Sequence, residues 1–227
     1  MRRDNENEGM NEDQHLIGQR MTTKTRGRTP SLRETALRAW VGRPSRQKSI
    51  YKIRFMENSL YIHNSGLVIL AAYFKRYFSM LDMLEDGAFR SEEDAIRGVL
   101  LLEYLASGRP EVAEHELVFN KVLCGLDIAT PVPTILEPTE QEAEISEQML
   151  NAILQNWDKM SNSTVENLQG SFLLREGLLR EHDAHWSLQV SSAGYDIILS
   201  FLPWTISIIS LPWVNKRLEV EWNTQTS

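Results

Sequence analysis

The stretch that decides the fold reads IILSFLPWTISIISLPWVN and runs from Ile197 to Asn215. It carries no charge, and its 19 residues are close to the roughly 20 that a helix needs to cross a bilayer. Pro203 and Pro212 would each interrupt such a helix, and three serines and a threonine lower its apolar character. Strand-like alternation begins directly after Pro203. We therefore expect no membrane span, and we interpret the stretch as the buried end of a folded domain.

Two Leu-Pro-Trp triplets within this stretch, Leu202–Trp204 and Leu211–Trp213, predict how it is held. The two prolines are expected to mark where the chain enters and leaves a central strand. The two tryptophans are expected to be mostly buried. The stretch is expected to pair with the alternating run Arg217–Trp222, and a second alternating run, Trp186–Val190, is expected to join the same small sheet.

Upstream of this stretch the sequence predicts a series of helices. Ser91 is followed by three acidic residues, Gly108 follows an apolar run, and Thr139–Glu142 forms a capping box. The expected helices are Leu67–Leu84, Glu92–Ser107, Ala113–Cys124, Glu140–Met160 and Thr164–Arg175, with short strands at Tyr51–Phe55 and Leu60–Ile62 and a short helix within Ala193–Leu202. The predicted fold class is mainly α within the α+β type: a compact helical body with a small C-terminal antiparallel β element.

The N-terminal region differs from the rest in charge. Residues 1–54 carry 13 Lys and Arg against 6 Asp and Glu, whereas residues 55–227 carry 11 against 25. Residues 1–30 lack apolar periodicity, which indicates disorder. We expect a flexible basic arm over residues 1–49 and a single globular domain over residues 50–227, helical with C-terminal strands. A single cysteine and a polar N-terminus without a secretory signal are typical of a cytoplasmic protein.

A basic arm on an acidic body has three uses: it can bind nucleic acid, line an acidic channel or fold back on its own body. Charge alone supports only non-specific nucleic-acid binding. The arm has one aromatic residue, Trp40, before Tyr51, and base stacking needs more. We therefore expect no specific nucleic-acid recognition.

The densest polar cluster in the sequence surrounds His182 and His185. Histidines three residues apart beside carboxylates can bind a metal. A solvated turn between a helix and a strand explains the cluster as well. Its other members are Glu176, Arg180, Glu181 and Asp183.

Other candidate sites have simpler explanations. The triplet Glu114–Glu116 lacks a second histidine at the spacing of a zinc protease. Cys124, at a helix end, is expected to be a buried small apolar residue, and an aromatic stripe over Tyr73–Phe78 is expected to be core rather than a ligand box. Phosphate-binding, dinucleotide-binding and nucleophile-elbow motifs are absent from the sequence. We therefore expect no enzyme and no catalytic, cofactor-binding or metal-binding residues.

A set of short motifs, taken in order, resembles a known family. The motifs are Tyr61–Leu70, Leu84–Gly87, Leu101–Gly108, Glu114–Leu126, Pro131–Pro133, Ser171–Gly177, the two Leu-Pro-Trp triplets and Val220–Trp222. Together they are similar to the tape-measure proteins of extracellular contractile injection systems, which are phage-tail-like particles of bacteria. The resemblance covers about Ile50–Trp222 and leaves out the N-terminal arm.

The resemblance implies a structural component of such a particle. Its role would be to determine the length of the inner tube or to initiate the tube at the baseplate. The implied partners are inner-tube, baseplate and spike proteins, with self-association as a further option. The implied location is the cytoplasm during assembly and then the released particle.

The predicted compact body sets a limit on direct measurement by one chain. A 50-residue arm would span only about 170 Å when extended, so several copies, an assembly or plug role, or a tip adaptor fits the compact body better than measurement by one chain. An alternative function is an assembly chaperone or interaction module that binds through the basic arm and is not retained in the particle. A third is a metal-dependent hydrolase that uses His182 and His185.

Overall fold

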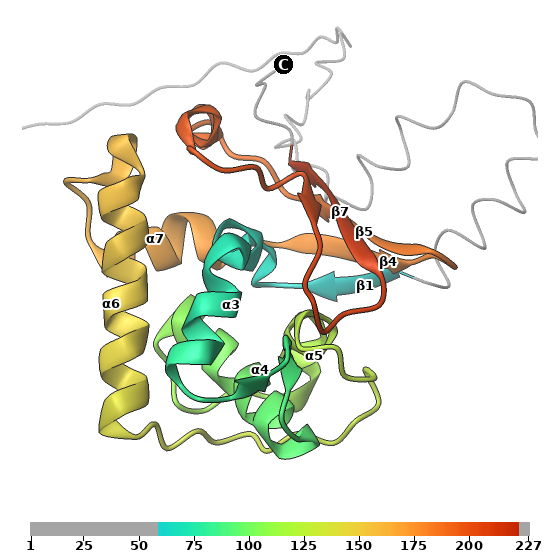
Figure 1. Cartoon of the computed structure of the whole chain (residues 1–227). Helices are drawn as coiled ribbons and strands as arrows, with labels where there is room; N and C mark the ends of the chain where they lie inside the picture. The colour runs from blue at the N-terminus through green and yellow to red at the C-terminus, as the bar shows by residue number, and fades with distance from the viewer. Residues whose placement is uncertain (1–58, 223–227) are drawn as a thin grey trace, which may run out of the picture. The chain divides into compact units, whose positions relative to one another are not determined.

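The central element of the fold is a five-stranded mixed sheet (Figure 1). The structure is a computed structural model that describes residues 59–222. The strand order is β1 (Ser59–Ile62), β4 (Gly177–Glu181), β5 (His185–Val190), β7 (Arg217–Trp222) and β6 (Ile208–Ile209). Neighbouring strands are antiparallel except β5 and β7, which run parallel. Strands from both ends of the described residues therefore lie in one sheet.

This sheet shows that the predicted fold class is wrong. Of residues 59–222, 46% are helical and 18% lie in strands, so the fold is α+β and not mainly α. The β element also extends beyond the C-terminal region, because β1 pairs with β4, and it is mixed rather than antiparallel. Local periodicity identified several strands, but pairing between strands so far apart in sequence leaves no local signal.

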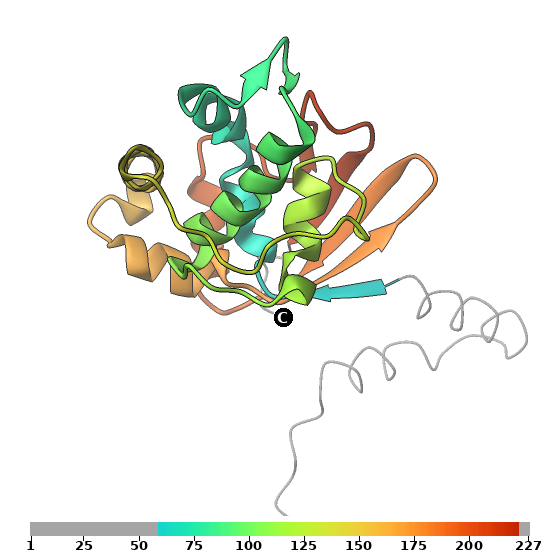
Figure 2. The same ribbon diagram turned by 90° about the horizontal axis from the view of Figure 1, so that it is seen from below.

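The helices gather on one side of the sheet, as Figures 1 and 2 show. A separate two-stranded hairpin, β2 (Leu84–Glu85) with β3 (Ala88–Phe89), was not predicted. The helical elements are η1 (Ser65–Ile69), α3 (Ala71–Met80), α4 (Glu92–Ser107), η2 (Glu114–Leu117), α5 (Val118–Leu123), α6 (Glu140–Asn156), η3 (Asp158–Met160), α7 (Val165–Leu168), η4 (Gln169–Leu173) and η5 (Asp196–Phe201).

The structure confirms the predicted helix ends that are marked by capping residues in the sequence. The Ser91 side chain accepts a hydrogen bond from the Asp94 amide at 3.1 Å, and Gly108 ends α4 with a left-handed φ of 68°. Thr139 and Glu142 form the predicted capping box of α6. Other predicted helices are divided: Leu67–Leu84 becomes the 3₁₀ helix η1 followed by α3, and Thr164–Arg175 becomes α7 followed by the π-helical η4.

The core lies between the helices and the sheet. Phe74, Tyr77 and Phe78 of α3 are almost fully buried, which confirms that most of the aromatic stripe is core, whereas Tyr73 is only partly buried. Close backbone packing accompanies this burial. A Cβ on Gly66 would lie 1.7 Å from the Phe172 carbonyl oxygen, so η1 can approach η4 only with glycine at this position.

The stretch Ile197–Asn215 lies at one edge of the sheet. Its two-residue strand β6 pairs with Leu218 and Glu219, which confirms the predicted pairing with Arg217–Trp222. Because β6 is the last strand in the order, the prediction of a central strand is wrong. Within residues 59–222, no helix combines the length and apolar character that a membrane crossing requires.

The two tryptophans of this stretch are mostly buried, as predicted, although neither is fully enclosed, and each indole contacts a helix end. Trp204 Nε1 donates to the Ile69 carbonyl at 2.9 Å, and Trp213 Nε1 donates to the Leu123 carbonyl at 2.9 Å. Ile69 and Leu123 are the last residues of η1 and α5, where helix carbonyls lack intrahelical partners. The tryptophans therefore attach the stretch to the helical layer by satisfying these carbonyls.

A buried ion pair fixes the start of the same stretch. Arg175 Nη2 lies 2.9 Å from Asp196 Oδ1, and the Asp196 side chain has no exposed surface. Asp196 Oδ2 accepts hydrogen bonds from the Ala193 amide at 2.7 Å and from Trp222 Nε1 at 2.9 Å. The Arg175 guanidinium lies 5.0 Å from the centre of the Tyr195 ring. This network joins the segment between η4 and β4, the start of η5 and the end of β7.

We predict that Asp196→Ala lowers the free energy of unfolding by about 3–5 kcal/mol, because it leaves the buried Arg175 guanidinium without its carboxylate. Urea denaturation of the full chain measures this loss. The matched control is Glu181→Ala, which breaks the solvent-exposed pair with Lys216 at 2.7 Å and is expected to cost less than about 1 kcal/mol. Equal losses in the two variants would contradict a stabilising role for the buried pair.

Candidate functional site

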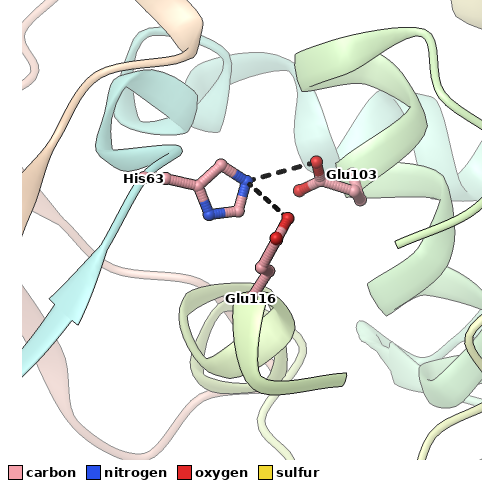
Figure 3. A group of neighbouring side chains, drawn as sticks. All are labelled: His63, Glu103 and Glu116. Atoms are coloured by element: carbon pink, nitrogen blue, oxygen red, sulfur yellow. Dashed lines mark hydrogen bonds and ion pairs between the residues drawn. The ribbon is translucent and has the colours of Figure 1, made fainter. Parts of the chain in front are cut away.

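Three described side chains converge as a potential metal-binding group: His63, Glu103 and Glu116. Figure 3 shows His63 reaching from the end of β1 toward the carboxylate of Glu103 on α4 and that of Glu116 on η2. One ligand atom from each residue lies within 4.8 Å of the other two. The Glu103 side chain is only 1% exposed, and those of His63 and Glu116 are about one-third exposed.

A guanidinium already supplies positive charge to this group. Arg109 Nη2 lies 3.3 Å from Glu103 Oε1 and 3.2 Å from Glu116 Oε2, so one cation bridges both carboxylates. His63 Nε2 lies 3.4 Å from Glu103 and 3.7 Å from Glu116. A metal ion bound by the three ligands would compete with Arg109 for the same oxygens. The geometry therefore fits an ion-pair cluster that joins β1, α4 and η2.

Asparagine side chains support the buried carboxylate from the other side. Asn64 Nδ2 donates to Glu103 Oε2 at 2.8 Å and to Asn120 Oδ1 at 2.7 Å, and Asn120 Nδ2 donates to the Val99 carbonyl at 3.1 Å. Asn64 Oδ1 is buried and has no hydrogen-bond partner among residues 59–222. These contacts extend the cluster from α4 into α5, so it is part of the packing between four elements.

The ionisation of Glu103 follows from these contacts. Burial by itself raises the pKa of the carboxyl, but the hydrogen bond and charge of His63, together with the hydrogen bond from Asn64, outweigh burial and lower the pKa below its usual value. A carboxylate that stays ionised and paired with Arg109 is a poor proton donor near neutral pH. The arrangement is suited to holding elements together rather than to acid–base catalysis.

The polar cluster predicted around His182 and His185 has a different geometry. The two imidazole rings stack with centroids 4.4 Å apart, His182 directly after β4 and His185 at the start of β5. His182 Nε2 lies 2.9 Å from Ser187 Oγ, and His185 Nε2 lies 3.7 Å from Glu219. Glu219 is near His185 alone: within residues 59–222 the two histidines and a third residue do not bring their ligand atoms within 4.8 Å of one another.

Two of the remaining members of that predicted cluster have separate partners. Glu181 pairs with Lys216 at 2.7 Å, and Arg180 Nε donates to Ser59 Oγ at 3.1 Å. The cluster is thus spread along the outer part of a hairpin. The hydrolase hypothesis has no converging site here.

Two further predictions concern the region around α5. Cys124 is buried, as predicted, and burial raises the pKa of its thiol well above the usual value. Of the triplet Glu114–Glu116, only Glu116 belongs to the ion-pair cluster. Glu114 instead accepts a hydrogen bond from Lys121 Nζ at 3.0 Å, which lowers the pKa of its carboxyl.

The sequence analysis missed His63 and Glu103. Glu103 had a readable signal, because it lies four residues after Val99 and so shares the buried face of α4. A charge on a buried helical face predicts a partner, since unpaired buried charges are costly. The sequence could not identify that partner, because His63 and Arg109 reach Glu103 from separate segments.

Comparison with known proteins adds a family match. A family model described as contractile injection system tape measure protein matches residues 2–222. No curated protein and no solved structure matches the chain. The matched range contains all of the described residues and also most of residues 1–49, which the resemblance in the sequence had left out.

We predict that Glu103 contributes stability that is lost in acid. Because folding lowers the pKa of this carboxyl, its contribution is fully present above the unfolded-state pKa of about 4.3 and disappears as pH falls through the folded-state value. Glu103→Gln should therefore lower the free energy of unfolding by about 1–3 kcal/mol at pH 7. The difference from the wild type should shrink below about pH 4.3.

Urea denaturation between pH 3 and pH 7 tests this dependence. Glu85→Gln is the matched control, because it makes the same change at an exposed position on β2. Its stability difference from the wild type should stay small at every pH. A difference for Glu103→Gln that remains constant over this range would contradict the assigned role of the carboxylate.

Proposed function

The chain belongs to the contractile injection system tape measure protein family, and from this membership we propose that its folded body anchors tube initiation or length determination at the baseplate. The role proposed is structural and non-enzymatic. The partners proposed are the inner-tube, baseplate and spike proteins. Assembly would take place in the cytoplasm, and the chain would then be part of the released particle.

The observation that carries this proposal is the sheet shared by both ends of the body. β1 starts at Ser59 and β7 ends at Trp222, yet both are strands of the same sheet. Fully extended, residues 59–222 would reach roughly 540–590 Å. That extension would break every strand pair and expose the core. The body therefore suits a fixed point of attachment, and any measurement of length would depend on residues 1–58 or on the number of copies.

The polar side chains of the body are consistent with a passive role. The ion-pair cluster around Glu103 joins the end of β1 to two helical elements, and the Arg175–Asp196 pair joins the segment between η4 and β4 to the start of η5. Both sets of contacts stabilise the fold against separation of its parts. Resistance to separation is what an anchor requires.

We predict that particles assembled without this chain have no tube or have tubes of altered length, because the point of attachment is missing. Electron microscopy of particles from a deletion strain measures tube length directly. Asp196→Ala, which is expected to destabilise the body, should reproduce part of the deletion phenotype, and Glu181→Ala should not. Normal particles of normal length in the deletion strain would contradict the proposal.

Insertions separate length determination from initiation. A flexible 20-residue insertion between Lys48 and Ser49 should lengthen the tube if residues 1–58 measure it, and should leave length unchanged if the body only initiates the tube. The same insertion between Ser161 and Asn162, in an exposed turn, is the matched control. Mass spectrometry of purified particles should detect the chain, whereas its absence would favour the chaperone alternative.

A further inference from the structure

An open groove of about 230 Å³ lies between α3 and α6, which are side by side in Figure 1. The helices run antiparallel, since the Tyr73 hydroxyl accepts a hydrogen bond from Asn156 at 3.2 Å while the Tyr77 hydroxyl lies 2.8 Å from Ser146 Oγ. The lining of the groove is mostly apolar. Met80, at its edge, leaves 41% of its surface exposed.

Apolar side chains form the bottom of the groove and polar side chains form its two walls. Tyr77, Ile145 and Met149 are buried and line the bottom. Methionine is flexible and polarisable, so Met80 and Met149 can adjust to an incoming surface. A groove with this composition is suited to binding another helical surface.

The two walls carry opposite charges. Lys75 and Arg76 are exposed on α3, and Arg76 lines the groove. Glu144 is exposed on α6, four residues before the groove residue Gln148 and hence on the same face. Glu140 and Glu147 are exposed on the same helix. Within residues 59–222, no salt bridge involves these cations or these carboxylates.

We propose that this groove binds the same groove of a second copy of the chain. A two-fold axis parallel to the groove would place α3 of each copy over α6 of the other, because rotation exchanges the two walls. Arg76 of each copy would then face Glu144 of its partner, and the exposed Met80 side chains would be covered. A two-fold interface requires such a self-complementary surface, and opposite charges on the two walls provide it.

The charges also argue against other occupants. A uniformly basic partner would be repelled by the α3 wall, and a uniformly acidic partner by the α6 wall. A lipid surface would have to remove water from charges of both signs without pairing them, which is costly. A second copy satisfies both walls at once. This inference depends only on the groove and is independent of the proposed role in the particle.

Charge reversal tests the proposal in the full chain. Sedimentation velocity over a range of concentrations should show a dimer for the wild type. Arg76→Glu and Glu144→Lys, tested separately, should each raise the dissociation constant by roughly tenfold or more, because each variant faces its own copy with like charges. An equimolar mixture of the two variants should restore association, because each reversed side chain then meets an opposite charge.

Two controls make the result specific. Glu85→Lys reverses an exposed charge on β2, outside the groove lining, and should leave the dissociation constant unchanged. Ala152→Trp places a bulky side chain in the groove lining and should prevent association without any change in charge. A monomeric wild type, a dimer insensitive to both reversals, or a mixture that fails to associate would each overturn the proposal.

Discussion

The buried ion pair between Arg175 and Asp196 is the interaction on which the C-terminal half of the fold depends. Removing two charges from water costs several kcal/mol per ion, so a buried pair persists only where further hydrogen bonds satisfy the charges. Asp196 receives bonds from Arg175, the Ala193 amide and the Trp222 indole, and the guanidinium also contacts the Tyr195 ring. The pair therefore connects the residues just before β4, the start of η5 and the end of β7.

Helices with local end signals and several individual strands were predictable from the sequence, but most of the strand pairing in the sheet was not. The bounds of α4 follow from Ser91 and Gly108, whose effects act within one helical turn. The sheet depends on contacts between residues that are distant in sequence. β1 pairs with β4, although all the long helices lie between these two strands in the chain, and β5 pairs in parallel with β7. The contacts of Trp204 and Trp213 are also distant in sequence, because the carbonyls that accept their hydrogen bonds belong to helix ends far upstream. The apolar character of the stretch predicted their burial but not these hydrogen-bond partners.

The candidate site shows the same division between local and distant information. The sequence drew attention to His182 and His185 because they are neighbours in the chain, and the structure places them as a stacked pair where β4 ends and β5 begins. The cluster that does converge combines His63, Glu103 and Glu116 from three separate elements, and Arg109 completes it. One member, Glu103, was detectable as a charge on a buried helical face. The partners of Glu103 could be identified only from the folded structure, because they come from separate segments of the chain.

The two layers of the body suggest a division of roles. The sheet holds the ends of the body, at β1 and β7, so forces transmitted along the chain enter through it. The groove between α3 and α6 lies in the helical layer, and Figure 1 places α6 on the side of that layer remote from the sheet. Contacts made through the groove therefore need not disturb strand pairing. The proposed anchor would use the helical layer for association and the sheet for attachment, and the ion pairs of Glu103 and Asp196 are contacts that would help to hold the body together in both uses.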